Sequence, residues 1–174
     1  HLLPFHQREQ TLLEDDADVL PLEPELDCLG PIIEHFGTLD DRYLVIHTKS
    51  VNVDWMLDLK HNGRTILVWS LAGPTQAGRI EPRTGTTAER IDAAARCQQA
   101  GYPVRYKFKP IIPVVGWREE AAETVELLFR RTRPDIISLA VFMWMDVDEM
   151  KRRLAGEPLD AEFLRAAEAA REQM

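Results

Sequence analysis

The sequence predicts an α/β fold in which helices cover a parallel β-sheet. Runs rich in β-branched and aromatic residues alternate with helical patterns at spacings of roughly 25 to 35 residues, which is the order that parallel βαβ units require. An apolar fraction of 45% with 29% charged residues is ordinary for a globular chain of 174 residues. We therefore expect one domain over residues 1–154, with residues 155–174 as an appended C-terminal helix.

The first half of the chain is predicted to contain two strands of the sheet, in which side chains alternate between two faces. A helix before them has apolar residues at helical spacing and ends at Gly37, a typical C-terminal stop. The predicted elements are a short strand at 11–14, a helix at 26–36, a strand at 43–50, a short helix at 51–60 and a strand at 65–71.

The second half continues the alternation of strands and helices. Thr86 and Glu89 have the spacing of a capping box, which predicts the start of a helix. The loop at 72–85 contains three glycines and two prolines and is too long for a simple connector, so it is either functional or mobile. The predicted elements are a helix at 86–101, a strand at 103–112, a helix at 117–132, a strand at 136–142, a short helix at 146–154 and a final helix capped by Asp160.

Charge and cysteine content limit the classes of function. A net charge of -8 disfavours a broad, sequence-independent grip on nucleic-acid phosphates, although a local basic site is compatible with it. Cys28 and Cys97 are too far apart in sequence for a short-spaced metal pair, and thiols of a reducing compartment are the simpler interpretation. Because no run approaches the roughly 18 apolar residues of a membrane span, we expect a soluble, cytoplasmic protein.

Candidate binding residues lie where the predicted strands end, because ligands of parallel α/β folds gather at the carboxyl ends of the strands. Lys49 and Ser50 follow one strand, and Ser70 ends the next. Alternation places Lys49 and Ser70 on the face that helices leave open. There Lys49 could pair with an anionic ligand group, or it could extend to solvent as an ordinary strand-end lysine.

Arg105, Lys107 and Lys109 alternate along the third long strand, opposite an aromatic and aliphatic face. They could form a patch that attracts phosphate or carboxylate groups. Alternatively, they could be the charges that protect an edge strand from pairing. The sequence leaves both interpretations open.

Other chemical signals are weaker. His47 and His61 are acid–base candidates, although a lone histidine is more often structural. The cluster of Asp15, Asp16 and Asp18 could bind a hard cation or form a solvated loop. No phosphate-binding glycine loop, nucleophile elbow or zinc motif is present, so we assign no catalytic residue and no metal site.

The order of motifs along the chain resembles the spore photoproduct lyase family of radical S-adenosylmethionine (SAM) proteins. The resemblance covers about residues 18–154. It rests on the stretch 43–71, followed by Ile80-Glu81-Pro82, Glu89-Arg90-Ile91-Asp92-Ala93-Ala94, Ala100-Gly101-Tyr102-Pro103-Val104, and Pro110-Ile111-Ile112 through Gly116-Trp117.

This resemblance implies a partial parallel (β/α) barrel of radical SAM type, lacking its first strands in this chain. In the family, a [4Fe-4S] cluster held by Cys-x3-Cys-x2-Cys cleaves SAM to a 5′-deoxyadenosyl radical, which begins repair of a thymine dimer in DNA. By position, Lys49 is similar to the lysine that contacts the methionyl carboxylate, and Ser70 to a strand-end serine at the cofactor. Ser50, beside Lys49, belongs to the same predicted set of cofactor-binding residues.

The sequence also departs from the family pattern. The three-cysteine loop is absent, and we expect Cys28 and Cys97 to lie in helices. Asp15 stands at the position of the hydrogen-donating cysteine and Ala17 at that of a cofactor-contacting serine, whereas Asp18 matches the family. The family's C-terminal substrate-binding region is shortened or absent.

Two hypotheses follow. In the first, the chain is the middle and C-terminal part of a radical SAM lyase, with its cluster loop upstream of His1 and DNA as its partner by resemblance; the chain alone should then be inactive. In the second, it is a cluster-free relative that acts as a structural or regulatory subunit, and a protein partner covers its open sheet edge. The start at His1 rather than at a methionine favours the first hypothesis.

Overall fold

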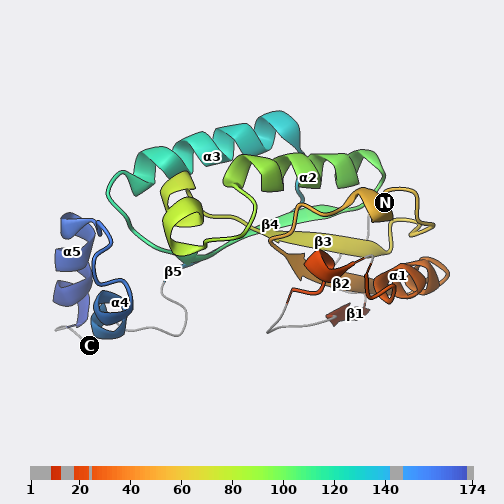
Figure 1. Ribbon diagram of the computed structural model, residues 1–174, viewed down its shortest axis with the longest axis horizontal. Helices are drawn as coiled ribbons and strands as arrows, with labels where there is room; N and C mark the ends of the chain where they lie inside the picture. Colours follow the sequence, from red (N-terminus) through yellow and green to blue (C-terminus); the bar gives the residue numbers. More distant parts are fainter. Residues whose placement is uncertain (1–8, 13–17, 24, 142–146, 172–174) are drawn as a thin grey trace.

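A five-stranded parallel sheet forms the centre of the molecule (Figure 1). The computed structural model describes residues 9–12, 18–23, 25–141 and 147–171. Within them, the strands follow one another in the sheet in sequence order, and every neighbouring pair is parallel. They are β1 (Glu9–Leu12), β2 (Arg42–Thr48), β3 (Thr65–Ser70), β4 (Val104–Ile111) and β5 (Ile137–Val141). This arrangement confirms the predicted α/β class with a parallel sheet.

Helices α1, α2 and α3 lie in the connections between strands, and α4 and α5 follow β5. In Figure 1, α2 and α3 run side by side above the sheet, α1 lies at one end, and α4 and α5 lie at the other. The helices are α1 (Leu29–Gly37), α2 (Thr87–Gln99), α3 (Trp117–Arg131), α4 (Val147–Arg153) and α5 (Ala161–Arg171). Shorter turns are the 3₁₀ segments η2 (Leu20–Leu22) and η3 (Asp54–Met56) and the π-helical turn η4 (Gln76–Ile80).

The two faces of the sheet bury different sets of side chains, as strand alternation requires. On the face covered by helices, Leu44, Ile46, Leu67, Trp69 and Tyr106 pack with residues of α1, α2 and α3 in the main core. On the opposite face, a smaller cluster consists of Tyr43, Val45, Ile66 and Val68. The alternation pattern therefore predicted correctly which residues of β2 and β3 lie on each face.

The predicted short helix at 51–60 is wrong, because only Asp54–Met56 forms a 3₁₀ turn. The chain has to reverse toward β3 within a few residues. The His61 amide donates to the Leu59 carbonyl at 2.9 Å, and the Arg64 amide donates to the His61 carbonyl at 2.8 Å. The carbonyl of Lys60 also lies against Gly37, where a β-carbon would collide with it.

Two other predictions need correction. The helix predicted at 26–36 begins at Leu29, because Asp27 adopts a positive φ of 46°, and Cys28 therefore precedes the helix instead of lying in it. The short strand predicted at 11–14 is observed at Glu9–Leu12, and residues 13 and 14 lie outside the described part. The capping box is confirmed, since the Glu89 amide donates to Thr86 Oγ1 and the Thr86 amide to Glu89 Oε2.

The C-terminal segment contacts the turn between β4 and α3. The Val115 amide donates to the Pro158 carbonyl at 2.7 Å, and the Asp160 amide donates to the Pro113 carbonyl at 2.8 Å. As predicted, Asp160 caps the last helix, because its Oδ1 accepts from the Phe163 amide at 2.8 Å. The division of the chain between residues 154 and 155 stays a prediction.

Candidate cofactor site at the carboxyl edge

The candidate site lies where β2 and β3 end side by side. Thr48 pairs with Trp69 in the parallel register, so the next residues, Lys49 and Ser70, are neighbours at the carboxyl edge. This is the edge at which parallel α/β proteins bind their ligands. Sequence reasoning placed both residues here, and the structure brings them together.

Lys49 is held at both ends. Its backbone amide donates to Asp18 Oδ2 at 2.6 Å, and its ammonium Nζ lies 3.1 Å from Glu81 Oε2. Asp18 Oδ2 also accepts from Thr48 Oγ1 at 2.9 Å, and Asp18 Oδ1 accepts from the Leu20 amide at 3.2 Å. The Asp18 carboxylate therefore fixes the backbone at the end of β2.

Glu81 in turn contacts Arg90, whose side chain is 0% exposed. Arg90 Nη2 donates to Glu81 Oε2 at 3.0 Å and to Thr84 Oγ1 at 2.6 Å. Its Nη1 donates to the Ser70 carbonyl at 2.9 Å, and its Nε donates to the Gly85 carbonyl at 2.7 Å. A buried guanidinium is tolerated when it is paired and hydrogen-bonded in this way. Arg90 thus joins α2, the end of β3 and the 72–85 loop.

The 72–85 loop is ordered around the buried side chain of Gln76. Gln76 Nε2 donates to the Pro110 carbonyl at 3.0 Å and to Glu81 Oε1 at 3.3 Å, and its Oε1 accepts from the Ile112 amide at 3.1 Å. These contacts fix the loop against the end of β4. The loop is therefore part of the site and not a loose connector.

Glu81 is shared by two cations, Lys49 and Arg90, and the Asp18 carboxylate lies beside them on the Lys49 backbone amide. Lys49 is the more accessible cation, because its side chain is 36% exposed whereas that of Arg90 is fully buried. A ligand carboxylate or phosphate that approaches this edge would meet the Lys49 ammonium first.

The two serines differ in how they are held. Ser50 is part of a tight turn: its amide donates to Thr48 Oγ1 at 2.8 Å, its Oγ accepts from the Asn52 amide at 3.0 Å, and its carbonyl accepts from Trp69 Nε1 at 3.0 Å. Ser70 is buried, and its carbonyl accepts from Arg90. The roles of both serines at a cofactor stay predictions.

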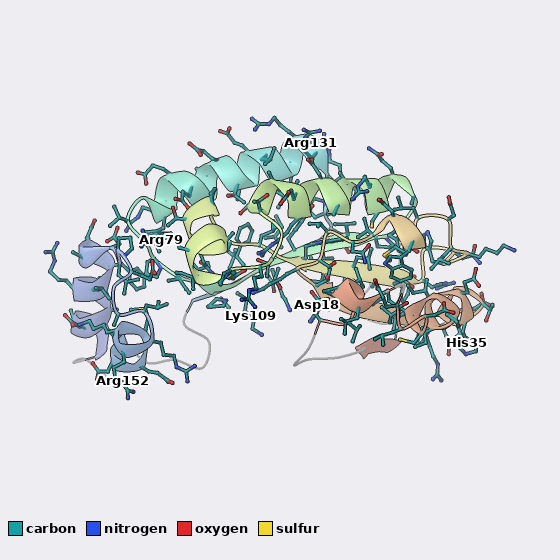
Figure 2. The ribbon with its side chains drawn as sticks, viewed as in Figure 1. Asp18, His35, Arg79, Lys109, Arg131 and Arg152 are labelled. Carbon is teal, nitrogen blue, oxygen red and sulfur yellow. The ribbon has the colours of Figure 1, made fainter. Side chains whose placement is uncertain are left out.

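The three cations of β4 do not form one uniform patch. Arg105 is buried, and its guanidinium makes a bidentate contact with Asp135, at 3.1 Å from Nε to Oδ1 and 3.0 Å from Nη2 to Oδ2. Lys107 pairs with Ser70 in the sheet register and is half-buried, whereas Lys109 is exposed. In Figure 2, Lys109 and Asp18 lie on the side of the sheet that faces away from α2 and α3. Lys107 and Lys109 are thus the members of the set nearer to the carboxyl edge.

The structure gives His61 a structural role. Its Nδ1 accepts from the Gly63 amide at 3.0 Å, its Nε2 lies 3.0 Å from the Ala100 carbonyl, and its ring stacks on Tyr102 with 3.5 Å between centroids. His47 is half-buried on β2. Asp15 and Asp16, candidates for a cation site, lie outside the described residues, and within those residues no cluster of three or more potential metal ligands is found.

The two cysteines do not make up the three-cysteine ligand set of the family motif. Burial raises the pKa of the Cys97 thiol to about 12. The hydrogen bond from Cys28 Sγ to Glu23 Oε1, at 3.0 Å, raises the pKa of the Cys28 thiol. Cluster ligation needs thiolates, and the whole sequence has only these two cysteines, so the chain does not supply three cluster ligands.

Sequence reasoning did not identify Glu81, Arg90 and Gln76 as parts of the site. Arg90 lies on a helix, where a charged residue is ordinarily assigned to the solvent face. Glu81 lies 32 residues after Lys49 in a loop, so no periodicity links the two. A signal was present in the motifs at residues 80–82 and 89–94, both of which belong to the family resemblance.

A parallel sheet whose strands follow sequence order, with helices packed against one face, defines a protein of the α/β class. The particular family follows from the sequence match. Residues 8–143 match the family model described as spore photoproduct lyase, and the chain belongs to this family.

Curated relatives and solved structures agree with this membership. The chain is 36% identical over 103 residues to spore photoproduct lyase of Bacillus subtilis (strain 168). The aligned residues make up 59% of this chain and 30% of the relative. It is 30% identical over 115 residues to spore photoproduct lyase from Geobacillus sp. (strain Y412MC61). This alignment covers 66% of this chain and 34% of that relative. The chain thus spans about a third of the length of these relatives.

Among solved structures, a spore photoproduct lyase double mutant with bound AdoMet and dinucleoside spore photoproduct has a TM-score of 0.74 at 24% identity. That comparison covers 90% of this chain and 48% of the other. A second spore photoproduct lyase, complexed with dinucleoside spore photoproduct, has a TM-score of 0.73 at 24% identity. These likenesses show that the fold is shared.

Proposed function

We propose that this chain forms the SAM-binding wall of a radical SAM lyase that acts on a DNA photoproduct. In this proposal the Lys49 ammonium binds the methionyl carboxylate, and Ser70 and Ser50 lie beside the cofactor. The observation that carries the proposal is Lys49 at the carboxyl edge of the sheet, with its backbone fixed by Asp18 and its partly exposed ammonium beside Glu81. Bound AdoMet in a related structure supports the choice of ligand.

The residues of the site fit AdoMet in the chemistry of their donors. The cofactor has a carboxylate that an ammonium can bind by a charge-assisted hydrogen bond. Lys107 and Lys109, two residues apart on β4, are proposed to attract the phosphates of a nucleic-acid substrate. Arg105 contributes less to such a patch, because Asp135 neutralises it.

When bound, AdoMet supplies a 5′-deoxyadenosyl radical in enzymes of this kind. The chain's own contribution is to bind and orient the methionyl end through Lys49. The chain has two cysteines, fewer than the three cluster ligands of the family motif, so no step through a cluster is assigned to these residues. In the proposal, the cluster loop lies upstream of His1. We also propose that the protein is located in the cytoplasm. None of the described helices is long and apolar enough to cross a membrane.

The direct test is SAM binding by the native protein, reconstituted anaerobically and measured by equilibrium dialysis with labelled SAM. Lys49→Ala should weaken binding by roughly tenfold or more, the usual cost of losing a charge-assisted contact of about 1.5–3 kcal/mol. Lys60→Ala removes an exposed lysine elsewhere and is the matched control, for which binding should not change. Equal binding by the wild type and Lys49→Ala would contradict the proposed role of Lys49.

The enzymatic part of the proposal is tested on the native protein, purified anaerobically from its source. We expect a mass above 19.9 kDa, about four irons after reconstitution and SAM-dependent release of 5′-deoxyadenosine. A native mass of 19.9 kDa without iron would instead favour the cluster-free structural or regulatory subunit. The shortage of cysteines is the observation behind that second candidate.

A further inference from the structure

We propose that Glu81 is the positioning residue that holds the Lys49 ammonium at the carboxyl edge, and that buried Arg90 keeps Glu81 in place. The inference rests on the proposed function, in which Lys49 binds the SAM carboxylate. It assigns Glu81 and Arg90 to the cofactor site although neither needs to touch the cofactor.

The first step of the argument is that Lys49 needs a restraint. A lysine has a flexible four-carbon stem, and ordering such a side chain costs up to about 2 kcal/mol of rotamer entropy. A strand-end lysine without a restraint would sample many directions in solvent. Here the Asp18 carboxylate fixes the Lys49 amide, and Glu81 Oε2 lies 3.1 Å from the ammonium.

The second step is that Glu81 is itself fixed. Its side chain is only 12% exposed, and its Oε2 contacts both Arg90 Nη2, at 3.0 Å, and Lys49 Nζ, at 3.1 Å. Its Oε1 accepts from Gln76 Nε2 at 3.3 Å. Both oxygens of Glu81 are therefore held, and the carboxylate cannot rotate away without losing a partner.

The third step is that Arg90 connects this restraint to the sheet. Its Nη1 donates to the Ser70 carbonyl, so the guanidinium that orients Glu81 also fixes the end of β3. Ser70 and Lys49 are the two residues proposed at the cofactor on neighbouring strands. One buried cation thus sets the relative position of both.

Charge explains why Glu81 positions Lys49 without blocking it. Glu81 shares its charge between two cations, so Lys49 is only partly neutralised and can still bind an incoming carboxylate. If Glu81 were paired with Lys49 alone, a ligand carboxylate would have to compete for the whole ion pair. Arg90 therefore makes the site receptive to an anion.

The test uses Glu81→Gln in the same reconstituted native protein, with two measurements. The affinity for labelled SAM should fall by about tenfold, as is typical when a partner of a ligand-binding residue is lost. The rate of amine acetylation at Lys49, followed by peptide mass spectrometry, should rise by about two- to fivefold, as expected when a partly exposed ion pair is lost. Acetylation at Lys60 in the same sample gives the reference rate.

Asp135→Asn is the matched control, because it also deprives a buried arginine, Arg105, of its carboxylate partner, but at a place that does not contact Lys49. It should lower thermal stability to a similar degree and leave both SAM affinity and Lys49 acetylation unchanged. Glu81→Asp should give an intermediate SAM affinity, because it keeps a charge for Arg90 but withdraws the carboxylate from Lys49. This variant also serves if Glu81→Gln does not fold.

The outcomes separate the inference from the proposed function. Binding that is lost in Lys49→Ala but retained in Glu81→Gln would overturn only the role of Glu81. Unchanged Lys49 acetylation in Glu81→Gln would also overturn the role of Glu81. So would a loss of SAM affinity in Asp135→Asn as large as that in Glu81→Gln. Absence of SAM binding by the wild type would overturn the proposed function and the inference that rests on it.

Discussion

At the scale of single residues, the chain holds its ionisable groups in two different ways. Lys49, Glu81 and Arg90 are charged groups whose partners lie on three different segments of the carboxyl edge. Cys97, in contrast, lies fully buried in α2 within the main core, as a neutral thiol. The first kind of group can bind a ligand, and the second contributes only packing.

Cys97 gives a prediction for alkaline pH. Burial raises the pKa of its thiol from 9.0 to about 12, so the folded state keeps a proton that the unfolded state releases. Stability should therefore fall as the pH rises above 9.0, by up to about 1.4 kcal/mol per pH unit for one proton. Urea unfolding at a series of pH values measures this slope.

Cys97→Ala is the variant that isolates the thiol. It should lose some stability at neutral pH, because it removes a buried side-chain atom, but its stability should depend less on pH just above 9.0. Burial also raises the pKa of Tyr102 and Tyr106, so a pH dependence that starts above 10.0 should remain. Identical slopes for the wild type and the variant would show that Cys97 is not responsible.

At the scale of elements, α2 contributes Arg90 to the candidate site at the ends of β2 and β3. Its N-terminal turn holds the capping box of Thr86 and Glu89, and Arg90 follows at the next position. The helix start therefore sets where the guanidinium reaches the Ser70 and Gly85 carbonyls. The hydrogen bonds from the Thr86 amide and hydroxyl also lower the pKa of Glu89.

Thr86→Ala should weaken this helix start. The lost cap is expected to cost about 1 kcal/mol of unfolding free energy, the usual value for removing a threonine N-cap. Because Glu89 has a lowered pKa in the folded state, the wild type also has an acid-labile contribution, which is present above the unfolded pKa and is lost as the pH falls through the folded one. Chemical unfolding at neutral and acidic pH checks both expectations.

A Thr86→Ser variant is the control for the cap. It should retain most of the stability, and a loss as large as that of Thr86→Ala would argue against the cap.

The elements differ in how well the sequence predicts them. Strands β2, β3 and β4 and helices α2 and α3 were predicted because their periodicity is determined locally by burial of one face. The 51–60 segment was predicted wrongly, since only Asp54–Met56 is helical and the chain then turns at His61 toward β3. For the site, Lys49 and Ser70 were predictable from strand ends, but the buried pair of Glu81 and Arg90 depends on how a loop folds over the sheet, and no local pattern encodes that.

At the scale of the whole molecule, the helical layer leaves one end strand of the described sheet incompletely covered. Leu139 on β5 pairs with Phe108 in the register but is 70% exposed. It lines a cavity of about 250 Å³ whose walls are mainly apolar and include Phe108, Trp117 and Val125. Exposed apolar surface at an end strand favours association with other chains. That a specific protein partner covers this edge stays a prediction.

This exposed edge leads to a prediction about self-association. Leu139→Lys places a charge on β5, and charged side chains on edge strands oppose pairing and aggregation. We expect the wild-type 174-residue chain to form larger species as its concentration rises, and Leu139→Lys to reduce them, as measured by sedimentation velocity. Leu22→Lys is the matched control, because Leu22 is also exposed, at 55%, but lies in η2 away from β5. If both variants reduced association equally, added charge in general would explain the effect, and the β5 edge would not be its cause.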